Sequence, residues 1–297
     1  MSSKKLVWRF RNLDWYALLL IAPALTFFSI FVIYPIIQTV WLSLWKWDRI
    51  SPGVWVGLDN YKTVLTNPEI YSAFSHSLVF VLFYSIIPIT IGLFITLLML
   101  RVKVKGEPFF RAVLFLPQII STVVVAISWR WIYAADGPIN KTLAKLGGES
   151  LTTAWLGNFD TSLIAVGIIG TWINYGLAMI LFISGAQRIS QDLLDADRID
   201  GANMRQEFRY ILIPSIKGEI SIVLIITFTF ALRNFDIVWN ATQGGPGNST
   251  NVPSLFIYKS AFVTRYVGEA AATSFLLAVL ILIVTGILLY TRRESND

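Results

Sequence analysis

Long apolar runs without charged side chains constrain this sequence more than any other feature. Residues 78–100 contain no Asp, Glu, Lys or Arg, and a run of about 20 apolar residues has the length of a membrane-spanning helix. Only 14% of the chain is charged, whereas soluble domains carry roughly a quarter. Backbone groups inside lipid must be hydrogen-bonded within the protein, which a helix achieves by itself. The sequence therefore predicts an all-α integral membrane protein.

Six stretches are apolar enough to cross the bilayer, and they predict one bundle of six transmembrane helices over residues 16–290. Their predicted ranges are residues 16–38, 78–100, 112–131, 163–186, 220–239 and 270–290. The fifth is cleanly apolar only to Leu232, because Arg233, Asn234 and Asp236 follow. We expect Arg233 and Asp236 to stack as an ion pair on one helical face, which leaves the Asn234 amide free on another face. The alternative is that this span ends at Leu232.

The positions of Lys and Arg predict which side of the membrane each end occupies. Most of the 24 Lys and Arg residues lie in the two termini and in the connections after the second and fourth spans. Cytoplasmic loops are enriched in these residues, so we expect residues 1–15 and 291–297 to be cytoplasmic. This topology explains the net charge of +6, and no nucleic-acid partner is predicted.

The residue inventory excludes several kinds of site. The chain has no cysteine and a single histidine, His76, so we predict no metal site and no catalytic residue. It also lacks the G-x-x-x-x-G-K-[ST] run that cradles nucleotide phosphates, and the glycine-rich residues 244–247 are expected to form a turn. We therefore predict that the chain is not an enzyme, has no ATPase site and binds no cofactor itself.

The polar connection at residues 187–219 has more pattern than a plain linker. Ser190 is suited to cap a short helix, Gly201 to end it, and Pro214 to stop a second helix over residues 202–213. The pattern predicts an elbow of two short helices on the cytoplasmic face, between spans four and five. Its periodicity fits an amphipathic connector on the bilayer and a docking element for a partner protein equally well.

Residues of this elbow resemble the EAA motif of ATP-binding-cassette importer permeases, in which an acidic-Ala-Ala helix precedes Asp-Gly-Ala and a later Leu-Pro. The matching positions are Asp195, Ala196, Asp197, Asp200, Gly201, Ala202, Phe208, Ile211, Ile213 and Pro214. Two of them depart from the motif, because Asp197 is charged where a small residue is usual and Ile213 replaces Leu.

Three further segments resemble the same family. They are the V-G-L-D-N-Y run at residues 56–61, Phe110-Arg111 with Leu116-Pro117, and Phe235-Asp236 followed by Thr242-x-Gly244-Gly245-Pro246. The resemblance thus covers nearly the whole chain. It is to the binding-protein-dependent sugar permeases of the maltose, lactose and glycerol-phosphate type, in particular to the first of their two permease subunits.

This resemblance implies a permease subunit of an ATP-driven, binding-protein-dependent importer of an oligosaccharide or polyol, in a bacterial cell (inner) membrane that it crosses several times. The implied partners are a second permease subunit, two ATPase subunits that bind ATP and Mg, an extracytoplasmic solute-binding protein, the sugar and the lipid bilayer. The elbow is implied to dock on an ATPase subunit through a coupling set: Asp195, Ala196, Asp197, Asp200, Gly201, Ala202 and Pro214.

An ion-gradient-driven secondary transporter of a small polar solute is the alternative. Against it, predicted spans one to four and six contain no carboxylate, and no inverted repeat of the kind common in such transporters is visible.

A pathway for a neutral sugar needs uncharged hydrogen-bonding groups and aromatic faces. Asn and Trp inside a bilayer are costly unless they are paired or face water. From this chemistry we expect the pathway to include Trp172, Asn174, Tyr175, Thr227, Phe230 and Asn234. The resemblance implies sugar contacts at Ile173, Asn174, Leu177, Thr227, Phe230, Ala231 and Asn234. Several of these positions are apolar here, so the particular sugar stays open.

Overall fold

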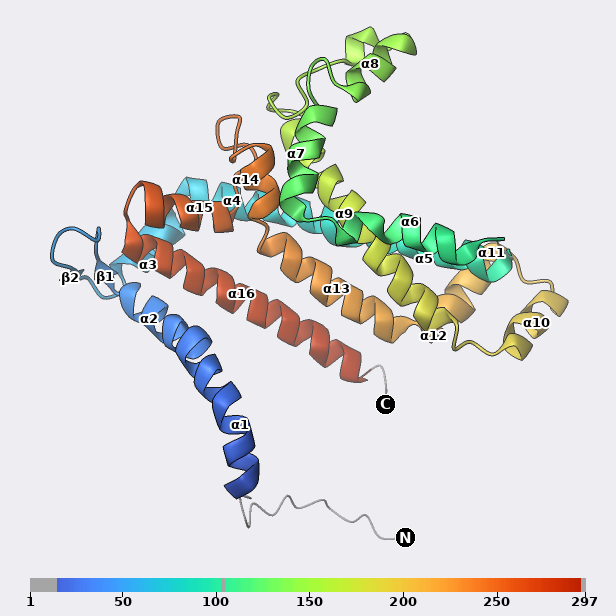
Figure 1. Cartoon of the computed structure of the whole chain (residues 1–297), viewed down its shortest axis with the longest axis horizontal. Coiled ribbons are helices and arrows are strands. Elements are labelled where there is room, and N and C mark those ends of the chain that lie inside the picture. The colour runs from blue at the N-terminus through green and yellow to red at the C-terminus, as the bar shows by residue number, and fades with distance from the viewer. Residues whose placement is uncertain (1–14, 103–104, 295–297) are drawn as a thin grey trace.

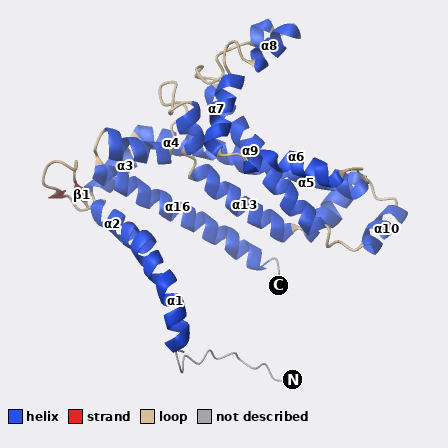
Figure 2. Cartoon of the chain, in the orientation of Figure 1, coloured by secondary structure: helices blue, strands red, loops and turns tan. Residues whose placement is uncertain are grey.

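The computed structural model describes residues 15–102 and 105–294. Residues 1–14, 103–104 and 295–297 lie outside the described part, and with them lie nearly all of the predicted cytoplasmic N-terminus and the end of the predicted cytoplasmic C-terminus. Helices make up most of the described chain (Figure 2). The exception to the all-helical prediction is a small antiparallel ribbon of β1 (Trp45–Lys46) and β2 (Val54–Trp55).

The helical segments are given below in chain order. The label η marks π-helical turns, except η3, which is a short 3-10 turn. The first half of the chain contains α1 (Trp15–Phe28), η1 (Ser29–Ile33), α2 (Tyr34–Leu42), α3 (Asp59–Thr66), α4 (Pro68–Val81), η2 (Leu82–Ile86), α5 (Ile87–Arg101), α6 (Glu107–Ile119), α7 (Thr122–Ile132), α8 (Pro138–Lys145) and η3 (Glu149–Leu151). The second half contains α9 (Ser162–Ala186), α10 (Gln191–Ile199), α11 (Met204–Gln206), η4 (Glu207–Leu212), α12 (Ile213–Ser215), α13 (Lys217–Leu232), α14 (Asp236–Ala241), α15 (Pro253–Tyr258), η5 (Lys259–Val263) and α16 (Val267–Glu294).

Four helices of the described chain are long and apolar enough to cross a membrane. They are Leu19–Leu42, Pro68–Arg101, Ser162–Ala186 and Val267–Tyr290. Two bent pairs raise the number to as many as six, if each pair is counted as one span. In these pairs α6 meets α7 at 95°, and the segment Met204–Ser215 meets α13 at 75°. The chain is therefore a helical protein with four to six candidate membrane spans.

The structure differs from the predicted third span, residues 112–131, which is not one helix. Pro117 lies in the last turns of α6, and the backbone is extended at Ile120, between α6 and α7. A proline lacks an N–H and its ring crowds the preceding turn of a helix. α6 nevertheless continues past Pro117 to Ile119, where the extended backbone at Ile120 interrupts the helical hydrogen bonds and α7 starts at a sharp angle.

The structure also differs from the predicted fifth span, residues 220–239. α13 ends at Leu232, and Asp236 begins the separate helix α14. The expected pairing of Arg233 with Asp236 is wrong, because residues three apart stack only within a continuous helix. Both residues are exposed, and none of the ion pairs among the described residues joins them.

α9 lies in the middle of the bundle, with α5, α6 and α13 packed around it (Figure 1). Glycines bring these helices close together: a Cβ at Gly92 of α5 would lie 2.9 Å from the Cβ of Ala178, and a Cβ at Gly170 would lie 1.8 Å from Cε1 of Tyr84. Small residues at helix contacts are typical of membrane bundles, where close van der Waals packing drives association. The core is therefore built around backbone contacts of α9.

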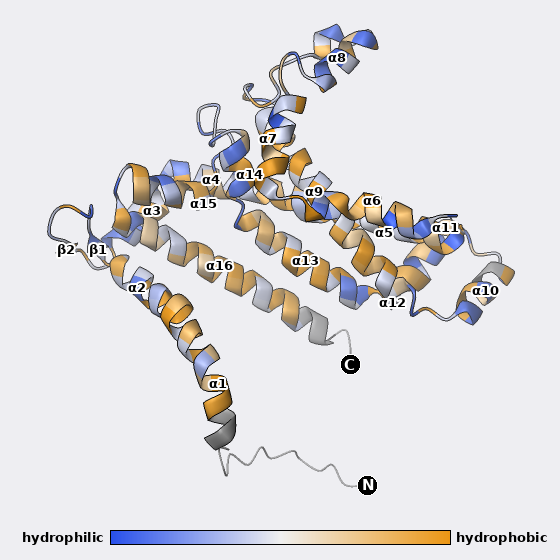
Figure 3. Ribbon diagram, in the orientation of Figure 1, coloured by the Kyte–Doolittle hydropathy of each residue, from blue (hydrophilic) through white to orange (hydrophobic). Residues whose placement is uncertain are grey.

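The N-terminal helix packs on α16 through α2, whereas α1 diverges from the bundle (Figure 1). None of its apolar window, Leu19–Leu42, is buried, whereas 61% of the window in α9 is. Its ribbon is coloured largely as hydrophobic (Figure 3), and Leu20, Phe27 and Phe31 are among its exposed residues. An apolar surface of this size must be covered by lipid or by another protein.

Candidate functional site

The predicted elbow between spans four and five projects from one end of the bundle (Figure 1). Its first helix, α10, starts after Ser190, whose Oγ accepts a hydrogen bond from the N–H of Leu193 at 3.4 Å. Leu194 is buried, whereas Leu193 and Ile199 are 48% and 85% exposed. α10 thus buries Leu194 and leaves two apolar side chains accessible at the projecting end of the molecule.

Gly201 forms the corner of the elbow. Its φ is +74°, and a Cβ there would have no atom within 4 Å, so the backbone conformation and not a lack of space favours glycine. The N–H of Asp200 bonds to the carbonyl of Ala196 at 2.9 Å. α10 thus ends just before a left-handed glycine, as many helices do and as the sequence predicts.

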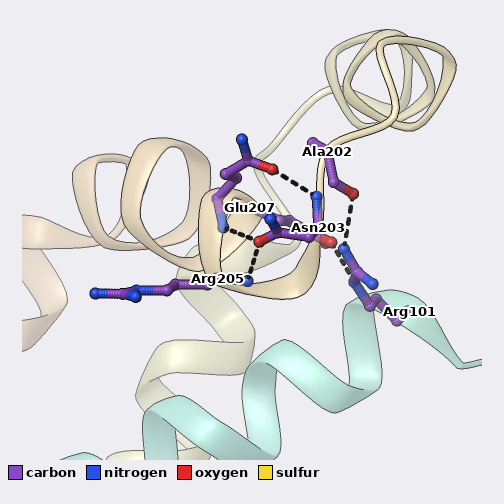
Figure 4. A network of polar contacts seen from close by, with 6 residues as sticks. Arg101, Ala202, Asn203, Arg205 and Glu207 are labelled. Carbon is purple, nitrogen blue, oxygen red and sulfur yellow. Dashed lines mark hydrogen bonds and ion pairs between the residues drawn. The ribbon is translucent and has the colours of Figure 1, made fainter.

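A second helical segment, Met204–Ser215, leads the chain back to the bundle. Oδ1 of Asn203 accepts a hydrogen bond from the N–H of Gln206 at 3.1 Å, and Oε1 of Gln206 accepts one from the N–H of Asn203 at 2.8 Å (Figure 4). This reciprocal capping box satisfies two backbone donors at the start of the segment. The first turn of the returning helix is therefore fixed by its own side chains.

The returning segment is anchored by apolar packing. Leu212 is fully buried in a cluster with Leu97 of α5 and Phe182 of α9. Pro214 does not stop this helix as predicted, because the helix continues to Ser215 and the bend toward α13 falls at Ile216. The missing N–H of Pro214 still weakens the last turn, so the break follows within two residues.

An ion pair also joins the returning segment to α5 (Figure 4). Nε of Arg101 donates to Oε2 of Glu207, and Nη2 of Arg101 donates to the carbonyl of Ala202 at 3.4 Å. The Glu207 side chain is 1% exposed, and its Oε1 is buried without a hydrogen-bond partner among the described residues. The last residue of α5 therefore contacts the elbow on both sides of Asn203.

The structure gathers most of the expected coupling residues at this projecting corner. Asp195 and Ala196 are exposed on α10, and Asp200 and Gly201 are exposed at its end. The carbonyl of Ala202 contacts Arg101, while Pro214 lies apart in the returning segment. The side chain of Asp197 lies outside the described part of the chain. Docking of this corner on an ATPase stays a prediction.

The polar residues expected in the substrate pathway have other surroundings than predicted. Asn234 is 2% exposed, and its Nδ2 donates to the hydroxyl of Tyr84 at 2.9 Å. Tyr84 is fully buried and stacks between Phe80 and Phe230, with ring centroids at 5.3 and 5.8 Å. The expectation of a free Asn234 amide facing the pathway is wrong in this conformation, because that amide bonds to the second predicted span.

A second polar pair lies beside the first. Oγ of Ser85 and Oγ1 of Thr227 are 2.6 Å apart, and both residues are fully buried. Asn174 is 3% exposed and donates to the carbonyl of Gly170 at 2.8 Å. Buried polar groups in a membrane bundle are stabilised by such pairing. Ser85 and Thr227 thus join the second and fifth predicted spans, whereas the Asn174 amide is satisfied within α9.

The remaining pathway candidates are distributed over two regions. Ile173 and Ala231 are buried in the core, and Trp172, Tyr175, Leu177 and Phe230 are partly buried. The Trp172 ring lies 5.9 Å from that of Trp129 on α7, whereas Phe230 packs on Tyr84. Of the expected set, therefore, Asn234 and Phe230 share one partner, and Trp172 belongs to a different aromatic contact.

Four residues of these two sites were missed by sequence reasoning. Tyr84 and Ser85 lie in η2, inside the apolar run at residues 78–100, and polar groups within such a run are a signal because lipid penalises them. Arg101 and Glu207 are 106 residues apart, and nothing local in the sequence connects them. The first pair could have been found from the sequence alone, whereas the second could not.

Comparisons with known proteins agree with this arrangement. Residues 88–294 match the family described as "Binding-protein-dependent transport system inner membrane component". The chain is 35% identical to the probable ABC transporter permease protein YurN of Bacillus subtilis, over 90% of this chain and 91% of that protein. It is 34% identical to the trehalose/maltose transport system permease protein MalF of Thermococcus litoralis, over 94% of each chain.

A solved structure shares the fold. A chain of a bacterial ABC transporter involved in the import of the acidic polysaccharide alginate superimposes with a TM-score of 0.79 at 22% sequence identity. The match covers 95% of this chain and 96% of that chain. At this identity the likeness concerns the arrangement of the helices.

Proposed function

Because the chain belongs to the family of binding-protein-dependent transport system inner membrane components, we propose that it is the permease subunit of an ATP-driven importer of a sugar. Relatives of nearly full length carry names that include trehalose/maltose, lactose and starch degradation products. The observation that carries the proposal is the projecting elbow, in which α10 and Gly201 stand free at one end of the bundle.

Coupling to an ATPase follows from what this elbow offers. α10 presents exposed apolar side chains beside the exposed carboxylates of Asp195 and Asp200. A short helix held at both ends can occupy a cleft on a partner and move with it. We assign ATP and Mg to the partner ATPase subunits, since this chain has no phosphate-cradling run. Its own part is to bind the partner and to move.

The transmembrane arrangement proposed is six spans with both termini in the cytoplasm of a bacterial cell. The two bent pairs, α6–α7 and Met204–Ser215 with α13, are each counted as one span. The Lys and Arg residues of both termini and of the elbow then share the cytoplasmic side, which is their usual distribution.

A second permease subunit is proposed to complete the pathway. The largely exposed helix α1–α2 supports this partner, because its apolar surface suits both lipid and the face of another membrane subunit. The solute-binding protein is assigned to the side on which α8 and the loop after α14 project from the bundle, away from the elbow (Figure 1).

The substrate is proposed to be an uncharged oligosaccharide or polyol. The interior polar groups where the second and fifth predicted spans meet are neutral hydroxyls and amides, Tyr84, Ser85, Thr227 and Asn234. Hydroxyls of a sugar can replace these mutual hydrogen bonds when the helices separate. The one carboxylate in the buried class among the described residues, Glu207, is at the end of the bundle and paired with Arg101, which disfavours an ion-gradient mechanism.

Purification of the tagged chain from its native membrane in mild detergent tests this proposal. We expect a second permease and an ATP-binding-cassette ATPase to purify with it in a defined ratio. A variant that lacks α10 (residues 191–199 replaced by a Gly-Ser linker) should retain the second permease but lose the ATPase. A pure homodimer without any ATPase would contradict the proposal.

A further inference from the structure

The last residue of α5 is bound to both ends of a short segment of the elbow. Arg101 contacts the carbonyl of Ala202, one residue after the Gly201 corner, and the carboxylate of Glu207, which begins the π-helical turn η4. A π-turn inside a helix is uncommon and occurs frequently at functional sites. The planar guanidinium reaches two acceptors at once, which a lysine ammonium on its flexible stem does less well.

Fold stability alone does not explain this ion pair. The returning segment already has the Asn203–Gln206 capping box and the buried Leu212. Buried ion pairs can often be replaced by apolar residues without loss of stability, and Oε1 of Glu207 is buried without a partner among the described residues. A buried acceptor left in this state calls for a reason beyond packing.

The contacts of Arg101 form the start of a continuous path into the bundle. α5 runs without interruption into η2, where Tyr84 and Ser85 bond to the fifth predicted span. Coupling between distant sites requires such a chain of rigid elements and specific contacts. A displacement of α10 would pull on Arg101 through Ala202 and Glu207, and α5 would carry it to the interior polar pairs.

We propose that Arg101 and Glu207 are positioning residues that form the joint between the elbow and the second predicted span. This inference rests on the proposed function, because it needs an ATPase that moves α10. The joint makes the second span follow the elbow, so that the contacts of Tyr84 with Asn234 and of Ser85 with Thr227 open and close with the ATPase cycle. Without the joint, the ATPase would hydrolyse ATP while the second predicted span would move little with the elbow.

The test uses the complete complex in proteoliposomes, with sugar uptake and ATP hydrolysis measured on the same preparation. Glu207→Gln should lower the sugar moved per ATP on the order of tenfold, within the usual range of coupling factors. The amount of assembled complex and its rate of ATP hydrolysis should stay near wild type. Arg101→Lys, which keeps the charge but not the two-pronged contact, should lose less than Arg101→Gln.

Lys62→Gln is the matched control, because it removes an exposed ion pair with Asp59 at the other end of the bundle, and it should leave the sugar moved per ATP unchanged. The joint is refuted if Glu207→Gln moves as much sugar per ATP as wild type, or if its whole defect is a smaller amount of complex. A wild-type preparation that transports without any ATPase would overturn the proposed function itself, so the two failures are distinguishable.

Discussion

Gly170→Ala should destabilise the bundle because the added methyl group would occupy the position of the Tyr84 ring. The new Cβ would lie 1.8 Å from Cε1 and 2.1 Å from Cδ1 of Tyr84, which is about half of a normal carbon–carbon contact distance of roughly 3.5–4.0 Å. The ring has no free direction, since Phe80 and Phe230 stack on it and Asn234 bonds to its hydroxyl.

The loss of stability expected for Gly170→Ala can be estimated from the contacts that the new methyl group would disturb. Overpacking a tight core typically costs about 1–3 kcal/mol, and breaking the Asn234–Tyr84 hydrogen bond while both groups stay buried adds about 1–3 kcal/mol. The alanine itself returns about 1 kcal/mol through its better helix propensity. We therefore expect a net loss of about 1–5 kcal/mol, from the sum of these packing and hydrogen-bond costs less the gain in helix propensity.

Gly286→Ala is the matched control for this prediction. Gly286 lies inside α16, and a Cβ there would meet nothing within 4 Å, so only the gain in helix propensity remains. The apparent melting temperature of the detergent-solubilised complex should fall clearly for Gly170→Ala and stay equal or rise slightly for Gly286→Ala. Equal melting temperatures for the two variants would refute the packing of Tyr84 on Gly170.

Three further predictions follow from the same contacts. Gly201→Ala should cost about 1–2 kcal/mol of local strain at the left-handed corner and lower ATP-driven uptake, measured per assembled complex, without lowering the amount of the second permease. Asn234→Ala should lower the apparent melting temperature, because the buried Tyr84 hydroxyl loses its donor. The double variant with Tyr84→Phe should recover part of the loss, and an additive double variant would contradict the contact. Single cysteines at the exposed positions Lys62 and Lys145 should react with an impermeant thiol reagent outside intact cells or spheroplasts, whereas a cysteine at Arg205 should not. Reversed labelling would overturn the proposed orientation of the chain in the membrane.

The sequence is sufficient to predict the helices of this protein because their cause is local. The uncharged run at residues 78–100 appears in the structure within the long helix Pro68–Arg101, and Gly201 ends α10 as its conformational freedom suggests. The Asn203–Gln206 capping box is equally local and is readable as Asn-x-x-Gln. Features that depend on neighbouring residues in the chain are thus open to prediction.

The features that the sequence could not specify depend on distant partners. Arg101 meets Glu207, and Tyr84 meets Asn234, across 106 and 150 residues respectively, so no periodicity links them. Arg233 and Asp236 are spaced as if on one helical face, yet α13 ends at Leu232. Whether a helix continues is decided by its tertiary packing more than by propensity. The sequence therefore predicted the shape of the elbow, whereas the pairing of Arg233 with Asp236 and the free amide of Asn234 were wrong.

ATP-dependent sugar uptake by the purified complex tests the central claim most directly. The complex should be reconstituted in proteoliposomes with ATP and Mg on the side of α10, and with the solute-binding protein and a labelled oligosaccharide on the other side. We predict accumulation that requires ATP hydrolysis and is unaffected when a proton or sodium gradient is collapsed. Accumulation by this chain alone, driven by an ion gradient and indifferent to ATP, would contradict the account.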